Sequence, residues 1–254
     1  MLALVCVAWT LAQVPCLRQA HAHNDYLHPR PLFDALEQGF TSVEADLFSV
    51  GDRLLVAHTS LELPFAKTFQ ELYLDPLENL AKGRRGKIVA DGRPLWLLVD
   101  IKNNAEKTWS LVAQEIAKRP TLFCRWEKGK RLEGPVCVVV SGSSPRKSIL
   151  EAEPRLAGVD GRLSDLGKGL NSEAVPWISD AWNSHFQWRG KGPLPEADQK
   201  KMRALVKQTQ AEGKQLRFWG GPDNEMAWAA LREAGVDRIG TDRLKECAAF
   251  LSKP

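Results

Sequence analysis

Short apolar runs of β type alternate along this chain with longer segments of helical pattern. The eight predicted strands are residues 16–23, 42–48, 95–101, 136–141, 156–160, 176–181, 215–219 and 236–240. The predicted helices include residues 31–38, 105–118, 195–212 and 224–234, with Gly235 expected to end the last one. Strands that alternate with helices pair in parallel. This order in 254 residues therefore predicts an α/β fold, a single (β/α)8 TIM barrel over residues 16–254.

The first fifteen residues, MLALVCVAWTLAQVP, carry no charge and are too few to span a bilayer as a helix. A small-residue cleavage site at residues 10–12 follows the apolar run, although the usual basic start is missing. Residues 1–15 are therefore predicted to be a signal peptide, and the expected location is secreted or periplasmic. A buried N-terminal strand or a misassigned start is the alternative interpretation.

The overall composition limits the classes of partner. An apolar content of 44% with 26% charged residues is typical of a soluble globular protein without a membrane span. The net charge of +4 is spread along the chain, so no nucleic-acid partner is expected. The five cysteines form no CxxC pair or zinc spacing, while a disulfide among the last four stays open in an exported protein. The composition does not determine the oligomeric state.

Polar residues cluster where the predicted strands end, which is where a TIM barrel carries its chemistry. They are His21, His23, Glu44, Asp46, Asp100, Lys102 and Asp242, with His58 at the end of a predicted hairpin over residues 53–57. Glu44 and Asp46 lie two apart and share one face of their strand, where burial of two acids requires a cation. The oxygen donors of Glu44, Asp46 and Asp100 suit one divalent cation, Mg²⁺ or Ca²⁺, better than zinc.

Several motifs carry a resemblance to a known family. They are HNDY at 23–26, PLFDAL at 31–36, GFTSVEAD at 39–46, LLVAHT at 54–59, LLVDIK at 97–102, ISDAWN at 178–183 and RFWGGPD at 217–223. Together they resemble the PLC-like phosphodiesterase superfamily, which includes glycerophosphodiester phosphodiesterases and sphingomyelinase D type enzymes. Within it the chain resembles most the bacterial relatives of altered inheritance of mitochondria protein 6. The resemblance extends over nearly the whole chain after residue 15.

The resemblance implies roles for individual residues. His23 and His58 match the catalytic histidines, although His21 would point to the same face as His23 and is the alternative to it. Glu44, Asp46 and Asp100 match the metal ligands. Lys102 matches the phosphate-side lysine, and His21, Asn24 and Trp219 are expected beside the substrate. Three positions depart from the glycerophosphodiesterase pattern: Asn24 replaces an arginine, Thr59 replaces an acid, and Asp100 replaces a glutamate, the last being closer to the sphingomyelinase D pattern.

The predicted function is a metal-dependent phosphodiesterase that cleaves a glycerophosphodiester or phospholipid-type phosphodiester by histidine general acid/base catalysis. Its expected partner is a small-molecule or lipid phosphodiester. An amidohydrolase-type enzyme that binds metal through His21 and His23 is one alternative, although it needs further histidines on strands five and six, where only His185 lies nearby. A non-catalytic ligand-binding barrel is the other. Trp182, Trp188 and Trp219 are expected either to line the site or to pack the core.

Overall fold

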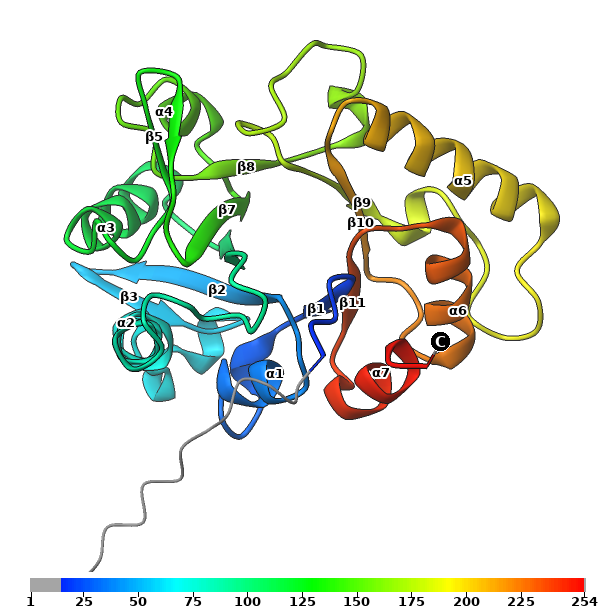
Figure 1. The fold of residues 1–254 in the computed structure, drawn as a ribbon, viewed down its shortest axis with the longest axis horizontal. Coiled ribbons are helices and arrows are strands. Elements are labelled where there is room, and N and C mark those ends of the chain that lie inside the picture. Colours follow the sequence, from blue (N-terminus) through cyan, green and yellow to red (C-terminus); the bar gives the residue numbers. More distant parts are fainter. Residues whose placement is uncertain (1–14, 254) are drawn as a thin grey trace, which may run out of the picture.

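Eight parallel strands form a ring in the computed structural model, which describes residues 15–253 (Figure 1). In spatial order the strands are β11 (Ile239–Thr241), β1 (Ala20–Ala22), β2 (Ser42–Val50), β4 (Leu95–Ile101), β7 (Val136–Gly142), β8 (Gly158–Gly161), β9 (Trp177–Ala181) and β10 (Gln215–Trp219). A single parallel bridge between Arg217 and Arg238 joins β10 to β11, so the ring is nearly closed. The predicted TIM barrel is confirmed. The predicted signal peptide, apart from Pro15, lies outside the described residues.

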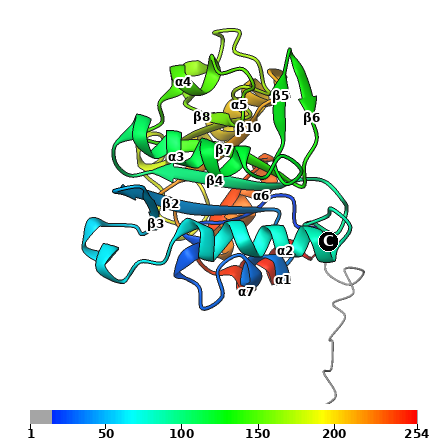
Figure 2. The ribbon, with the colours of Figure 1, turned by 90° about the vertical axis from the view of Figure 1, so that its left-hand side faces the viewer.

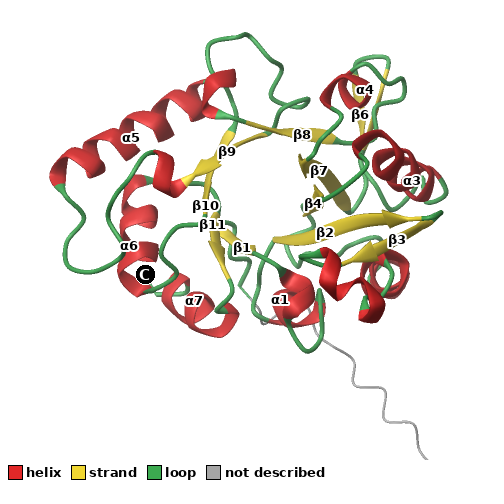
Figure 3. Cartoon of the chain, turned by 180° about the vertical axis from the view of Figure 1, so that it is seen from behind, coloured by secondary structure: helices red, strands yellow, loops and turns green. Residues whose placement is uncertain are grey.

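Helices surround the ring of strands (Figure 3). They are α1 (Phe33–Glu37), α2 (Asp75–Gly83), α3 (Ala105–Ala117), α4 (Arg146–Leu150), α5 (Glu196–Ala211), α6 (Glu225–Ala234) and α7 (Leu244–Leu251). All four predicted helices are present, and Gly235 ends α6 in the left-handed conformation with φ 83°. Within the described residues no helix has both the length and the apolar character needed to cross a membrane.

Apolar side chains fill the barrel on both sides of the strands. The outward faces pack against the helices in one large core. Inside the ring, Leu98, Val139 and Trp177 form a small buried cluster against Trp96. Because side chains alternate between the two faces of a strand, Asp100, two residues after Leu98 in β4, points to the same inward face. The polar site therefore lies directly above an apolar layer, at the mouth, the end of the barrel where its parallel strands finish.

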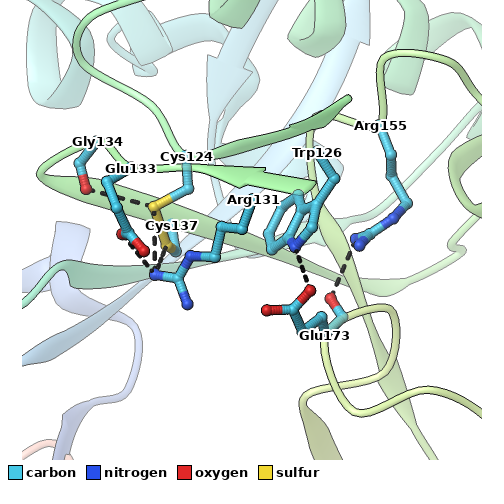
Figure 4. The surroundings of a disulfide bond; sticks show 8 residues. All are labelled: Cys124, Trp126, Arg131, Glu133, Gly134, Cys137, Arg155 and Glu173. Atoms are coloured by element: carbon cyan, nitrogen blue, oxygen red, sulfur yellow. Dashed lines mark hydrogen bonds and ion pairs between the residues drawn. A yellow bond between two sulfur atoms is a disulfide. The ribbon is translucent and has the colours of Figure 1, made fainter. Parts of the chain in front are cut away.

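A two-stranded hairpin and a disulfide lie near the end of the barrel opposite the mouth. The hairpin consists of β5 (Arg125–Glu127) and β6 (Lys130–Leu132), and the disulfide joins Cys124 to Cys137 of β7. In Figure 4 the Arg131 guanidinium contacts both sulfur atoms, with Nη2 3.3 Å from Cys137 Sγ. The disulfide left open by the cysteine spacing is thus Cys124–Cys137, and Cys16 and Cys247 are free thiols.

Candidate active site

Three carboxylates meet at the barrel mouth. Glu44 and Asp46 project inward from β2, and Asp100 of β4 lies beside Asp46 in the parallel register. One oxygen atom from each of the three lies within 4.8 Å of the others. Among residues 15–253 this is the one group of acids, histidines or cysteines with the spacing of a metal site. The predicted ligands are therefore brought together.

Glu44 uses one oxygen for protein contacts. Its Oε2 accepts hydrogen bonds from Arg217 Nη2 at 2.6 Å and from His21 Nε2 at 2.9 Å. Burial opposes ionisation, yet the Arg217 charge and the His21 hydrogen bond lower the pKa of Glu44 below its ordinary value. No hydrogen bond from the described residues reaches Oε1. Glu44 is therefore an ionised carboxylate with one bonded oxygen and one free oxygen.

Asp46 has the same division between its two oxygens. Its Oδ2 accepts hydrogen bonds from Tyr26 Oη at 2.8 Å, His58 Nδ1 at 2.9 Å and Lys102 Nζ at 2.8 Å. Its Oδ1 is buried and has no partner among the described residues. A buried carboxylate oxygen without a partner is costly. The bare oxygen of Asp46 thus fits a cation held between the three acids.

Asp100 shows the charge imbalance of the site. Its pKa is raised to about 6 by burial, and the neighbouring charges of Asp46 and Glu44 add to this against the opposing effect of Lys102. Three carboxylates against the two cations Lys102 and Arg217 leave an excess negative charge. A divalent cation would remove that excess, and oxygen ligands are those that Mg²⁺ and Ca²⁺ prefer. The donor set therefore fits the predicted cation.

A glycine makes room for the Asp100 carboxylate. Gly142 ends β7 with φ 67°, and a Cβ built at this position would lie 2.2 Å from Asp100 Oδ1. Any side chain here would both strain the backbone and displace the carboxylate. Gly142 is thus part of the site although it offers no functional group.

Two histidines flank the carboxylates, each with one ring nitrogen bound to an acid. His23 Nδ1 lies 2.8 Å from Asp242 Oδ1, and His58 Nδ1 contacts Asp46. Burial opposes protonation of His23, but the hydrogen bond to Asp242 raises the pKa of His23 above its ordinary value. Because each Nδ1–H donates to a carboxylate, each Nε2 is left without a hydrogen-bond partner among the described residues.

The hairpin of β2 with β3 (Arg53–Val56) brings His58 to the mouth, as predicted. The Ala57 N–H donates to the Asp46 carbonyl at 3.1 Å, and the His58 N–H donates to Glu62 Oε2 at 2.8 Å. These two backbone contacts fix the start of the loop that carries the imidazole.

His21 lies behind Glu44 and not at a substrate-facing position. It is fully buried, and its Nδ1 lies 2.7 Å from Ser42 Oγ while Nε2 contacts Glu44. Burial and the charge of Arg217 lower the pKa of His21 to about 3, so the ring is neutral. A neutral ring donates from Nε2 to the carboxylate and accepts from the Ser42 hydroxyl. His21 therefore orients Glu44.

The amidohydrolase arrangement is not what the structure contains. That arrangement requires His21 and His23 to share a metal with Asp242. Here both nitrogens of His21 are engaged, and Asp242 is paired with His23 outside the carboxylate cluster. The geometry favours the phosphodiesterase assignment.

The remaining predicted residues lie at the same mouth. Lys102 Nζ contacts Asp46 and, at 3.4 Å, Asp100 Oδ1, so its charge lies against the acids. Asn24 adopts φ 44°, and its Oδ1 lies 3.0 Å from the Tyr26 hydroxyl. Trp219 is 46% exposed and lines a pocket of about 220 Å³ together with His23. Trp182 and Trp188 are buried in the core, and Trp182 also lines this pocket.

Sequence reasoning missed Tyr26, Arg217 and Asp25. Arg217 precedes Trp219 by two residues, so the period of two could have placed it on the inward face of β10. Tyr26 lies in the short helix η2 (Asp25–Leu27), which has no periodicity to reveal it. Asp25 is buried, and its Oδ2 accepts hydrogen bonds from the Leu32 N–H at 2.6 Å and from the Tyr73 hydroxyl at 2.9 Å.

Comparison with known proteins places this site in a family. Residues 11–156, more than half of the chain, match the AIM6-like phosphodiesterase domain. The altered inheritance of mitochondria protein 6 homolog of Arthroderma benhamiae is 27% identical over 91% of this chain and 82% of its own length. Altered inheritance of mitochondria protein 6 of Eremothecium gossypii is 27% identical over 96% of this chain and 72% of its own length. These relatives are fungal, not the bacterial ones that the motifs led us to expect.

Solved structures show the same fold at low sequence identity. A glycerophosphodiester phosphodiesterase from Parabacteroides distasonis superposes with a TM-score of 0.60 at 15% identity, over 93% of this chain and 98% of that chain. A phosphodiesterase from Oleispira antarctica, solved with its product sn-glycerol-3-phosphate, gives a TM-score of 0.56 at 14% identity, over 92% of this chain and 97% of that chain. The chain therefore belongs to the AIM6-like phosphodiesterase family, and it is a phosphoric diester hydrolase built on a TIM barrel.

Proposed function

We propose that the chain is a divalent-cation-dependent phosphodiesterase that uses His23 and His58 for proton transfer. One observation carries this proposal above the others: the carboxylates of Glu44 and Asp46 each use one oxygen for protein donors and leave the other bare. Glu44, Asp46 and Asp100 would hold the cation, Mg²⁺ or Ca²⁺. When bound, the cation supplies positive charge to the phosphoryl oxygens of a diester that otherwise repels nucleophiles.

The two histidines divide the proton transfers. Each is held at Nδ1 by a carboxylate and has Nε2 available, the arrangement expected of a general acid or base. One imidazole takes the proton of the attacking hydroxyl, from water or from the substrate, while the other gives a proton to the leaving oxygen. Lys102 adds positive charge beside Asp46 and Asp100, where the phosphate would lie.

The substrate class in this proposal is a small-molecule or lipid phosphodiester. The test is a panel of glycerophosphodiesters and lysophospholipids followed by phosphorus NMR, with Mg²⁺, with Ca²⁺ and with excess chelator. We expect turnover only with a cation, and the spectrum separates hydrolysis from release of a cyclic phosphate. Full activity in chelator would refute the role of the cation.

Variants separate proton transfer from metal binding. His23→Ala should lower turnover about 10²-fold or more while cation affinity stays close to that of the wild type. His28→Ala is the matched control, because His28 lies in the same loop and makes no side-chain hydrogen bond to the described residues. Asp100→Ala should lose cation binding and turnover together. Near-normal turnover of His23→Ala would reject the assignment.

We also propose that the protein is exported, as residues 1–15 predict. The Cys124–Cys137 disulfide supports this, because disulfides persist in oxidising compartments and are rare in the cytosol. Fractionation of cells that express the full chain would test it, and a protein recovered from the cytosol at full length would contradict it.

A further inference from the structure

Large hydrophobic side chains are exposed around the barrel mouth. Seven such side chains are exposed among the described residues. Val50 and Trp219 are the last residues of β2 and β10, Leu27 follows β1, and Leu61 and Phe65 follow the β2–β3 hairpin. Phe65 is 91% exposed and Leu61 is 87% exposed. Side chains this apolar rarely gather at full exposure on a soluble protein without an interaction to serve.

The most exposed pair lies immediately beside the candidate active site. Leu61 and Phe65 belong to the short helix η3 (Ser60–Phe65), which begins two residues after His58. Figure 2 shows this segment, cyan between β3 and α2, projecting from the end of the molecule opposite the β5–β6 hairpin. Leu27 follows Tyr26, whose hydroxyl lies 3.4 Å from His58 Nδ1, so its segment adjoins η3. The three side chains therefore belong to two rim segments that both adjoin His58.

The exposed helix is anchored to the catalytic loop. Glu62 lies between the two apolar residues, and its Oε1 accepts from the Thr59 hydroxyl at 3.0 Å while Oε2 accepts the His58 N–H. These bonds tie η3 to His58 and Thr59, so the exposed side chains Leu61 and Phe65 belong to a segment that is bonded to the loop of the site.

The position of the surface, beside the site that would receive a phosphodiester, favours a lipid partner. From the typical areas of such side chains, Leu27, Leu61 and Phe65 together offer on the order of 400 Å². A standard protein interface buries about 800 Å² from each partner, of which somewhat more than half is apolar, so the area alone is compatible with either kind of partner. For a lipid surface, a few inserted aromatic and aliphatic side chains suffice for reversible binding.

We propose that Leu27, Leu61 and Phe65 form a docking surface for a zwitterionic phospholipid layer, which would place the barrel mouth against the lipid headgroups. The acids Glu62, Asp223 and Asp242 at the same mouth disfavour a strongly anionic surface. Inserted into the headgroup region, the rim brings the carboxylate cluster to a phosphodiester that stays in the layer. This deepens and rests on the proposed function, since it makes the substrate a lipid phosphodiester.

The test measures vesicle binding separately from catalysis. Wild type, a Leu61→Ser/Phe65→Ser double variant and a Phe65→Leu variant are sedimented with phosphatidylcholine vesicles. Burial of each side chain contributes enough that its loss should weaken binding about 10-fold, so the double variant should bind about 100-fold more weakly. Phe65→Leu keeps an apolar side chain and should bind within about 3-fold of wild type. Because both positions are exposed, thermal unfolding should be unchanged and checks the fold.

Several results would overturn the docking surface. They are no binding of wild type to phosphatidylcholine, equal binding of the double variant, binding that requires anionic lipid, or a change of oligomeric state in the double variant. Turnover provides the second arm: the double variant should lose activity on lysophosphatidylcholine in vesicles and keep it on soluble glycerophosphocholine. If wild type binds vesicles through these residues but cleaves neither substrate, the proposed function fails while the docking surface stands.

Discussion

Replacement of Gly142 by alanine is expected to disable cation binding while it leaves the barrel folded. The Cβ would lie 2.2 Å from Asp100 Oδ1 and 2.5 Å from the Ile101 carbonyl oxygen, whereas ordinary contact begins at 3.4 Å. The Asp100 carboxylate would therefore have to retreat by about 1 Å, and metal ligands tolerate only about 0.2 Å. The positive φ adds roughly 1–2 kcal/mol of backbone strain. We expect cation affinity to fall at least about 10-fold.

Gly169 supplies a matched control for this variant. It has φ 68°, against 67° at Gly142, and no atom lies within 4 Å of the position of its Cβ. Gly169→Ala therefore carries the backbone strain without the contact to Asp100. Binding of Mn²⁺ by titration calorimetry and thermal unfolding should be measured for both variants. If Gly142→Ala binds Mn²⁺ as wild type does and unfolds like Gly169→Ala, the close approach to Asp100 has no functional consequence.

Three further outcomes follow from the same structure. Replacing Cys124 and Cys137 by alanine opens a loop with a sequence separation of 13, which should cost about 3 kcal/mol and lower the Tm by roughly 6–12 °C, and reductant should then leave the Tm of the variant unchanged. Burial raises the pKa of Asp25 to about 7, above its ordinary 3.8. The protonated carboxyl therefore contributes to stability below pH 4, and this contribution is lost as the pH rises to 7. Denaturant titrations should show the loss in wild type and not in Asp25→Asn. Arg217→Met removes the guanidinium that pairs with buried Glu44, which should lower the free energy of unfolding by about 3–5 kcal/mol in chelator and by less with Mn²⁺. Thermal unfolding measures both, and an equal loss in the two conditions would contradict the binding of Mn²⁺ beside Glu44.

The sequence predicts the fold well where periodicity is strong. All eight strands occur where apolar runs predicted them, but β1 covers only Ala20–Ala22 of the predicted residues 16–23. Leu17 pairs with Phe40 as a single bridge, and Asn24 turns the chain at φ 44°, so neither end continues the strand. Helices α2, α4 and α7 and the β5–β6 hairpin were not predicted. Helix α4, with five residues, makes little more than one turn and so gives only a weak periodic pattern.

The site was predictable only to the level of individual strands. The spacing of two placed Glu44 and Asp46 on one face, as the structure has them. The pairing of Glu44 with Arg217 spans 173 residues, and that of His23 with Asp242 spans 219. No local pattern encodes such contacts, because they exist only once the barrel closes. This is why the positions of His21 and His23 beside the cluster were indistinguishable in the sequence, although the structure gives them different partners.

The two oxygens of Asp46 give the site a thermodynamic coupling. Oδ2 accepts from the imidazole of His58, while Oδ1, which has no partner among the described residues, is the oxygen that the proposed cation would bind. Rotation of this one carboxylate would therefore disturb both the cation and the histidine. In a double-mutant cycle, residues that share a partner show large interaction energies. If the proposed function holds, the losses caused by Asp46 and His58 substitutions should therefore not be additive, and the Asp46 loss should combine effects on metal binding and on proton transfer.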